Sequence, residues 1–131
     1  MASDGLTTIE SHFGPKETLD RLEDDVKAKG LTVFARIDHA AGAAAVGMTL
    51  LPTAVLIFGN ARGGTPLMQV RQLIGIDLPL KVLVWPDTWG KTWLSYYDPS
   101  VLASRYGLSG ETATPSRSSF ESTWKGFDAC V

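Results

Sequence analysis

Two short stretches of the sequence hold the residue types that could perform chemistry. The first is Arg36-Ile37-Asp38-His39, in which a carboxylate and an imidazole are adjacent. An Asp–His pair can orient a general base, but such a base also needs a nucleophile or a substrate proton within reach. No Gly-x-Ser-x-Gly elbow supplies that nucleophile. The alternative is structural: Asp38 caps a short helix over residues 40–48, and His39 is hydrogen-bonded to the backbone.

The second stretch is the glycine-rich segment from Gly59 to Thr65. A turn of this kind between a strand and a helix offers free backbone N–H groups and the positive end of a helix dipole, so a small anion could bind there beside Arg62. It is not a Walker motif, because no Lys precedes Thr65. The alternative is a plain turn in which Asn60 and the glycines adopt unusual backbone angles and Thr65 caps the next helix.

Metal and thiol chemistry find little support in the sequence. His12 and His39 are its two imidazoles, and they are not spaced as a helical i,i+4 pair. Cys130 is the single cysteine, which excludes an intramolecular disulfide and a clustered-thiol zinc site. We therefore expect neither a metal nor a cofactor.

The composition limits the class of protein and of partner. A chain of 131 residues suits one domain, and 44% hydrophobic with 20% charged residues is enough to build a core. The net charge of −2 argues against a nucleic-acid or membrane partner bound by charge alone. Readers of single-stranded RNA place basic residues among exposed rings, and that signature is missing here.

One uncharged run, from His39 to Ala61, is long enough in principle to span a bilayer. Pro52 interrupts it, and residues 54–58 have the pattern of a short buried strand, so we expect no membrane partner. At the other end of the chain, no basic-then-apolar signal peptide follows Met1, which makes a cytoplasmic location the default expectation.

The elements that would position these residues follow from the spacing of apolar side chains. Alternation over residues 7–13 and again over 31–38 predicts two strands. Leu19, Leu22 and Val26, at i, i+3 and i+7, predict a helix over residues 16–29 between them. The remaining elements are the short helix at 40–48, a strand at 54–58, a helix that begins at Pro66 with Leu67, Val70 and Ile74 facing inward, a hairpin of 80–85 and 92–97, and a helix from 99 to 106.

This order, β-α-β-α-β-α-β-β-α, predicts an α+β two-layer sandwich. Its mostly antiparallel sheet would have about five strands, with the helices on one face. We expect the helix-facing residues to be Ile9, Val33, Ala35 and Ile37, and the uncovered face to gather Glu10, His12, Phe34 and Arg36. Either Leu83, Trp85, Trp93 and Tyr97 or their alternates join the uncovered face, because the register of the hairpin is open. A face with such aromatic side chains should be covered by a second subunit or a ligand, or else by the tail or a loop.

The sequence resembles the family known as domain of unknown function 302. The resemblance covers residues 6–112 and rests on an ordered set of motifs: Arg36-Ile37-Asp38-His39-Ala40-Ala41, Pro52-Thr53, Phe58-Gly59-Asn60, Gly64-Thr65-Pro66-Leu67-Met68, Asp77-Leu78-Pro79-Leu80-Lys81, Gly90-Lys91 before Tyr97, and Arg105-Tyr106-Gly107-Leu108. It implies a small α+β domain that self-associates and has no established activity. We therefore expect one domain over residues 1–112 and a divergent tail over 113–131.

Two departures from the family pattern affect the expected surfaces. Ala61 stands where the family usually has Pro, which predicts a less rigid turn after Asn60. Ala43-Ala44-Ala45-Val46 replaces charged residues on the short second helix, and this surface should need a partner.

Together these features predict a cytoplasmic homodimeric binding or accessory module that pairs through the open sheet face. The edge able to bind a small anionic ligand would be formed by Asp38, His39, Asn60, Gly64 and Thr65, with Arg36 and Gly63 as further ligand-binding candidates. The alternative is an enzyme acting on a small anionic metabolite. In that case His39 would be the base and Asp38 its orienter, with the Gly63-Gly64-Thr65 amides as the anion cradle.

Overall fold

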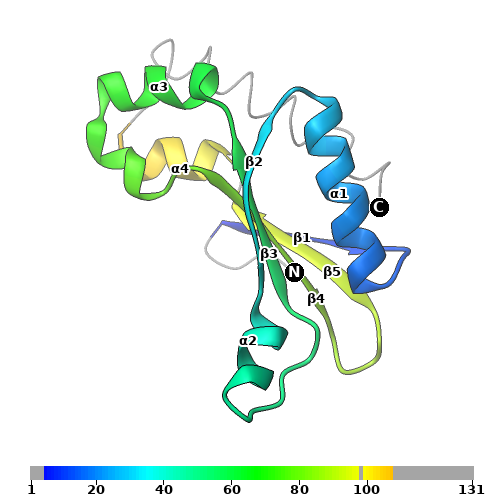
Figure 1. The fold of residues 1–131 in the computed structure, drawn as a ribbon. Coiled ribbons are helices and arrows are strands. Elements are labelled where there is room, and N and C mark those ends of the chain that lie inside the picture. Colours follow the sequence, from blue (N-terminus) through cyan, green and yellow to red (C-terminus); the bar gives the residue numbers. More distant parts are fainter. Residues whose placement is uncertain (1–4, 98, 108–131) are drawn as a thin grey trace.

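The computed structural model describes residues 5–97 and 99–107. Within these ranges the chain forms a five-stranded antiparallel sheet in the order β1-β5-β4-β3-β2 (Figure 1). The strands are β1 (Leu6–Ser11), β2 (Thr32–Asp38), β3 (Ala54–Gly59), β4 (Leu80–Pro86) and β5 (Thr92–Tyr97). The predicted α+β class and order of elements are confirmed.

The helices alternate with these strands along the chain. They are α1 (Pro15–Ala28), α2 (His39–Ala45), α3 (Ala61–Val70), the 3₁₀ helix η1 (Gln72–Ile76) and α4 (Pro99–Arg105). Gly30 and Gly107 follow α1 and α4 with positive φ values of 78° and 70°, as expected for glycines that end helices in the left-handed conformation. The tail predicted over residues 113–131 lies outside the described residues.

The core lies between α1 and one face of the sheet. Leu22 and Val26 of α1 are fully buried there, as are Leu56 and Phe58 of β3. The other core side chains are Leu19, Leu67, Ile74, Leu80, Val82, Val84, Leu94 and Leu102. Full burial of such a side chain contributes about 1.5–3 kcal/mol, so this cluster holds the helices against one face of the sheet.

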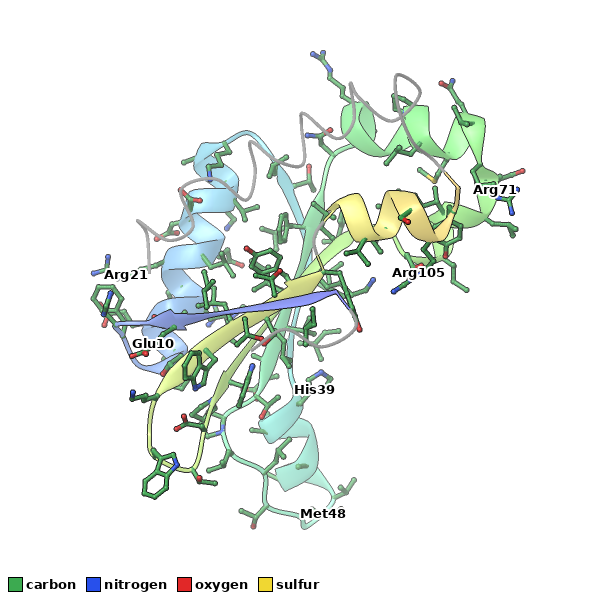
Figure 2. The ribbon with its side chains drawn as sticks, turned by 180° about the vertical axis from the view of Figure 1, so that it is seen from behind. Glu10, Arg21, His39, Met48, Arg71 and Arg105 are labelled. Carbon is green, nitrogen blue, oxygen red and sulfur yellow. The ribbon has the colours of Figure 1, made fainter. Side chains whose placement is uncertain are left out.

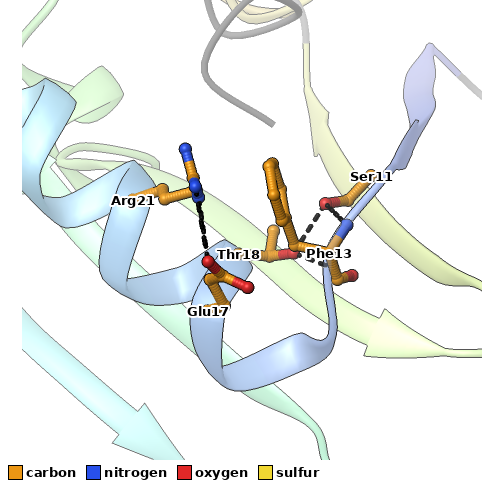
Figure 3. Close-up of polar contacts among 5 residues, drawn as sticks. All are labelled: Ser11, Phe13, Glu17, Thr18 and Arg21. Carbon is orange, nitrogen blue, oxygen red and sulfur yellow. Dashed lines mark hydrogen bonds and ion pairs between the residues drawn. The ribbon is translucent and has the colours of Figure 1, made fainter.

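The connection between β1 and α1 fastens the edge strand to the helix (Figure 3). The hydroxyls of Ser11 and Thr18 share a buried hydrogen bond of 2.6 Å, and Thr18 also donates to the carbonyl of Phe13 at 3.2 Å. The guanidinium of Arg21 lies 3.7 Å from the centre of the Phe13 ring and 3.3 Å from Glu17. These contacts are structural, since they join the edge strand β1 to α1.

A bulge in β2 overturns the predicted facing of that strand. The register shifts between Val33 and Ala35, so Phe34 is an extra residue opposite β3. Beyond the bulge every side chain changes face: Ile37 lies on the open face, and Arg36 lies on the helix-covered face. The prediction assumed uninterrupted alternation, and one inserted residue inverts it.

The end of α3 also differs from the predicted inward stripe. Leu67 and Ile74 are buried, but Val70 is 52% exposed. The helix ends at Val70 because Arg71 adopts extended angles, with φ −140° and ψ 94°. Ile74 therefore reaches the core from η1 instead of from the same helix.

Candidate functional site

Most of the glycine-rich segment, from Ala61 to Thr65, forms the start of α3 and is not an open loop. The Asn60 side chain caps the helix by accepting a hydrogen bond from the N–H of Gly63 at 2.6 Å. The N–H of Gly64 donates to the Asn60 carbonyl at 3.1 Å. The predicted helix start at Pro66 with Thr65 as its cap is therefore wrong, and the amides of Gly63 and Gly64 are not available as an anion cradle.

Asn60, Gly64 and Thr65 do come together, around a small cavity of about 270 Å³. The rest of its lining is mainly apolar and consists of Phe34, Gly59, Ala61, Met68, Gly75, Leu78, Pro79 and Leu80. Such a lining suits a small uncharged group better than an anion, because a buried charge needs paired donors.

Asp38 and His39 lie at the opposite end of the same strands. Gly59 pairs with Thr32, whereas Ala54 pairs with Asp38, so five residue steps of β3 separate the two ends, about 17 Å. In Figure 1, α2 lies at one end of β2 and β3, and α3 lies at the other end. The single ligand-binding edge that we predicted is wrong: its members form two separate corners.

The Asp38 corner has the structural role that the sequence left open as an alternative. The Asp38 carboxylate caps α2 by accepting from the N–H of Ala41 at 2.9 Å. The backbone N–H of His39 donates to the carbonyl of Thr53 at 2.8 Å. The His39 side chain is exposed. The structure does not bring His39 and Asp38 together with the amides of Gly63, Gly64 and Thr65, so the predicted base, orienter and anion cradle do not form one site.

Arg36 packs against α1 instead of facing a ligand. Its guanidinium lies 2.7 Å from the Asp20 carboxylate and 3.7 Å from that of Glu23, a consequence of the bulge in β2. A hydrogen bond from Lys16, followed by the one from Arg36, lowers the pKa of Asp20. The Arg36 side chain thus joins the edge strand β2 to the helix layer.

The open face of the sheet is a broad surface that crosses all five strands. The register places Thr8, Ser95, Leu83, Val55 and Ile37 in one row across all five strands. It settles the alternative that the sequence left open, because Leu83, Trp85, Trp93 and Tyr97 lie on this face and their alternates in the core.

This face is concave, with a hollow of about 830 Å³. We call it the open-face hollow. It is lined by Leu6, Thr8, Val55, Lys81, Leu83, Trp85, Asp87, Thr88, Trp89, Trp93, Ser95, Tyr96 and Tyr97. Its size lies within the range of ligand sites, and its floor is mainly apolar, so it can bury a substantial apolar group.

Hydrogen bonds fix the rings on the floor of the hollow. The indole N–H of Trp85 donates to Ser95 Oγ at 2.9 Å, and that oxygen also lies 2.9 Å from Thr8 Oγ1. The Trp85 and Trp93 rings pack side by side with centres 6.4 Å apart and an angle of 30°. Because the Trp85 N–H already has a partner, the exposed part of its ring is apolar contact surface.

Asp87 holds the rim of the hollow and was missed as a key residue by the sequence reasoning. Its carboxylate accepts from the indole N–H of Trp93 at 2.9 Å, and from the backbone N–H groups of Trp89 at 2.9 Å and Lys91 at 3.0 Å. The indole bond, and after it the backbone bonds, lower the pKa of Asp87. The signal was present in Pro86-Asp87-Thr88-Trp89-Gly90, since Asp is favoured at the start of such turns.

A second polar cluster, outside the candidate site, ties α4 to the segment before β4. The Tyr106 hydroxyl donates to the Asp77 carboxylate, which Arg105 also contacts at 3.3 Å. The hydrogen bond lowers the pKa of Asp77 and raises that of Tyr106. Both directions fit a tyrosine that donates to an ionised carboxylate, which is a structural contact.

In residues 5–97 and 99–107, no group of three His, Cys, Asp or Glu side chains is arranged to hold a metal ion. Over the same ranges, no helix combines the length and the apolar character needed to cross a membrane.

Comparison with known proteins places the chain in a family. The model of the family described as domain of unknown function DUF302 matches residues 7–123, which is most of the chain. The chain belongs to the DUF302 family. The match runs past residue 112, where the resemblance was expected to end, and into the segment predicted to be a divergent tail.

The fold is shared with a solved DUF302 structure. An uncharacterised conserved DUF302 protein from Bacillus stearothermophilus superimposes with a TM-score of 0.79 at 21% identity. The alignment covers 98% of this chain and 96% of that one. A likeness at this level of identity establishes the fold alone.

Curated relatives of this DUF302 chain are longer proteins. It is 47% identical over 111 residues to proteins named fluoride-specific ion channel FluC 1 in Brucella suis and Brucella abortus, and FluC 2 in Brucella melitensis. The aligned segment is 83% of this chain but only 41–44% of those proteins. The chain thus spans less than half the length of the relatives it matches.

Proposed function

We propose that this chain is a homodimeric accessory module whose open sheet face is the contact between two copies. The observation that carries the proposal is the open-face hollow. Its floor is mainly apolar, and hydrogen bonds hold the Trp85 and Trp93 rings in it. Trp and Tyr side chains of this kind are enriched at the energetic centres of protein interfaces. A twofold pair is the commonest way for a chain to cover such a surface.

The module acts, in this proposal, beside an ion channel. The relatives named fluoride-specific channels carry the same segment within chains more than twice as long as the match. The solved Bacillus stearothermophilus protein, 96% of which aligns with this chain, has the same fold. A segment that is part of proteins named as channels and that also makes up most of a solved DUF302 chain favours a module that serves a channel.

Sedimentation equilibrium with two matched variants tests the dimer. Ile37, on the open face, is 41% exposed, and Ile76, in η1, is 82% exposed. We expect the wild type to sediment at twice the 14.1 kDa mass of the chain. Ile37→Asp should weaken the dimer at least about tenfold, because a charge would be buried in an apolar contact, whereas Ile76→Asp should leave it unchanged.

A monomeric wild type at micromolar concentration would contradict this proposal. So would equal effects of the two substitutions, since that outcome places the contact elsewhere. Circular dichroism of both variants checks that each is folded before the masses are compared.

The small-anion site, the enzymatic alternative and the cytoplasmic location stay predictions. The geometry favours the accessory module over the enzyme, because the proposed base and the proposed anion cradle lie at opposite ends of β3. Thermal unfolding with sodium fluoride, phosphate or a carboxylate tests the anion site: stabilisation by one anion that Asn60→Ala or Thr65→Val abolishes would support it. Loss of turnover of that ligand in a folded His39→Ala variant would support the enzyme.

A further inference from the structure

The connection between β2 and β3 is an apolar arm that projects from the molecule. We call residues 39–53 the arm. α2, within it, has no buried residue, and the side chains beyond it are exposed: Val46 by 71%, Met48 by 67%, Leu50 by 47% and Leu51 by 52%. The arm has no Asp, Glu, Lys or Arg. Figure 1 shows α2 beyond the end of the sheet and away from the other helices, and Figure 2 marks Met48 there.

Hydrogen bonds give the arm a defined shape. The N–H groups of Gly47 and Met48 donate to the carbonyls of Ala44 and Ala43, both at 2.9–3.1 Å. With Gly47 at φ +78°, this is the Schellman arrangement that ends helices. At the arm's base the Thr53 hydroxyl donates to the carbonyl of Leu51 at 2.7 Å. Because its shape is already fixed, the arm loses little conformational freedom when it docks.

The arm and the rim of the open-face hollow lie at the same end of the sheet. Ala54, where the arm joins β3, pairs with Val84 near the end of β4, and Val84 pairs with Leu94 near the start of β5. The turn between β4 and β5 carries Trp89, which lines the hollow and is 87% exposed.

We infer that the arm of one copy inserts into the open-face hollow of a second copy, and that the second copy's arm is received in return. The inference rests on the proposed homodimer and names the segment that fills its contact. The arm and the open-face hollow are both apolar and occur on the same chain. A single twofold operation therefore covers both of them in each copy.

The exposed apolar surface is of the order that such a contact needs. Seven large apolar side chains of the arm and the open face are more than 40% exposed: Ile37, Val46, Met48, Leu50, Leu51, Trp89 and Tyr97. The aromatic side chains Trp89 and Tyr97 offer about 150–250 Å² each when fully exposed, and the five aliphatic side chains are smaller, so the set offers on the order of several hundred Å² per copy. A standard stable interface buries about 800 Å² per partner.

Mixing two variants tests the exchange of arms. Leu50→Asp/Leu51→Asp alters the arm alone, and Trp89→Asp alters the rim alone; all three residues are exposed, which favours folded variants. Each variant by itself should dimerise at least about a hundredfold more weakly than the wild type in sedimentation equilibrium. An equal mixture should recover part of the lost affinity, because a mixed dimer keeps one intact arm in one intact hollow.

A crosslink provides an independent readout. In a Cys130→Ser background, a Leu50→Cys chain mixed with a Trp89→Cys chain should form the mixed disulfide in preference to either homodimeric one. Preference for a homodimeric disulfide, or no recovery of affinity in the mixture, would overturn the inference.

The remaining outcomes separate this inference from the proposed function. A wild-type dimer that the arm substitutions leave intact overturns the inference alone, whereas a monomeric wild type overturns both. Binding of the wild type to phosphatidylcholine vesicles, lost in the Leu50→Asp/Leu51→Asp variant while the oligomeric state is unchanged, would assign the arm to a lipid surface and overturn the inference.

Discussion

At the scale of single residues, Asp87 organises the aromatic end of the open face. One carboxylate oxygen accepts from the Trp93 indole, and the other accepts from two backbone N–H groups of the turn that carries Trp89. A carboxylate can accept all three bonds at once, and its charge strengthens them. The orientation of Trp93 and the position of Trp89 therefore depend on one ionised side chain.

The substitution Asp87→Asn tests this dependence. The amide nitrogen cannot accept a hydrogen bond, so either the indole or the backbone partners lose theirs. At pH 7 we expect the variant to unfold at lower urea concentration than the wild type, with tryptophan fluorescence as the readout. Exposed Asp24 of α1 offers the control, and Asp24→Asn should have little effect.

The pH dependence of the same experiment follows from the lowered pKa of Asp87. The folded protein holds this pKa below the ordinary value of 3.8, so between the two values the unfolded chain binds more protons. The stabilisation is complete above about 3.8 and is lost as the pH falls through the folded pKa. The difference between wild type and Asp87→Asn should therefore shrink at low pH; a constant difference down to pH of about 2 would contradict the account.

At the scale of elements, the first turn of α3 depends on its cap. Asn60 satisfies the N–H of Gly63, and the helix then runs through two buried glycines to Leu67. The same turn forms one wall of the small cavity between α3 and the segment before β4. A loss at the cap should therefore be felt in both the helix and the cavity.

Two substitutions at position 60 separate capping from size. Asn60→Ala should destabilise the protein by about 1 kcal/mol, within the range of about 0.5–2 kcal/mol for lost caps. Asn60→Asp keeps an acceptor and adds a charge that suits a helix N-terminus, so it should retain most of the stability. Chemical unfolding measures both values, and equal losses for the two variants would show that capping is not the reason.

Most elements could be predicted from the sequence, but not all of their helix caps. The strands and the order of elements follow from alternation and helical spacing, which local chemistry dictates. The cap at Asp38 was foreseen because Asp precedes an alanine-rich run, but Asn60 was overlooked in favour of Thr65-Pro66, a pair that also resembles a helix start. Pro66 is instead accommodated inside the helix.

Tertiary context decided the features that the sequence could not supply. The bulge at Phe34 leaves no mark in the alternation of β2, yet it moves Arg36 to the side of α1. Likewise, only the paired strands show that Asp38 and Asn60 lie at opposite ends of β3. The aromatic open face was predicted, and its members were fixed only by the hairpin register.

At the scale of the whole molecule, the helices and the core occupy one side of the sheet, and the candidate function lies on the other. α2 contributes nothing to the core and extends the apolar surface beyond the sheet. In the proposed account, a second copy covers this surface, and the resulting pair serves an ion channel.

Small-angle X-ray scattering of the wild-type chain tests this central claim most directly. A compact chain of 131 residues has a radius of gyration of about 14 Å, and a compact pair has about 18 Å. We predict the larger value at micromolar concentration and a fall toward the smaller one for Ile37→Asp. A wild type that keeps the radius of a single chain at every concentration, with its open face bare, would contradict the account.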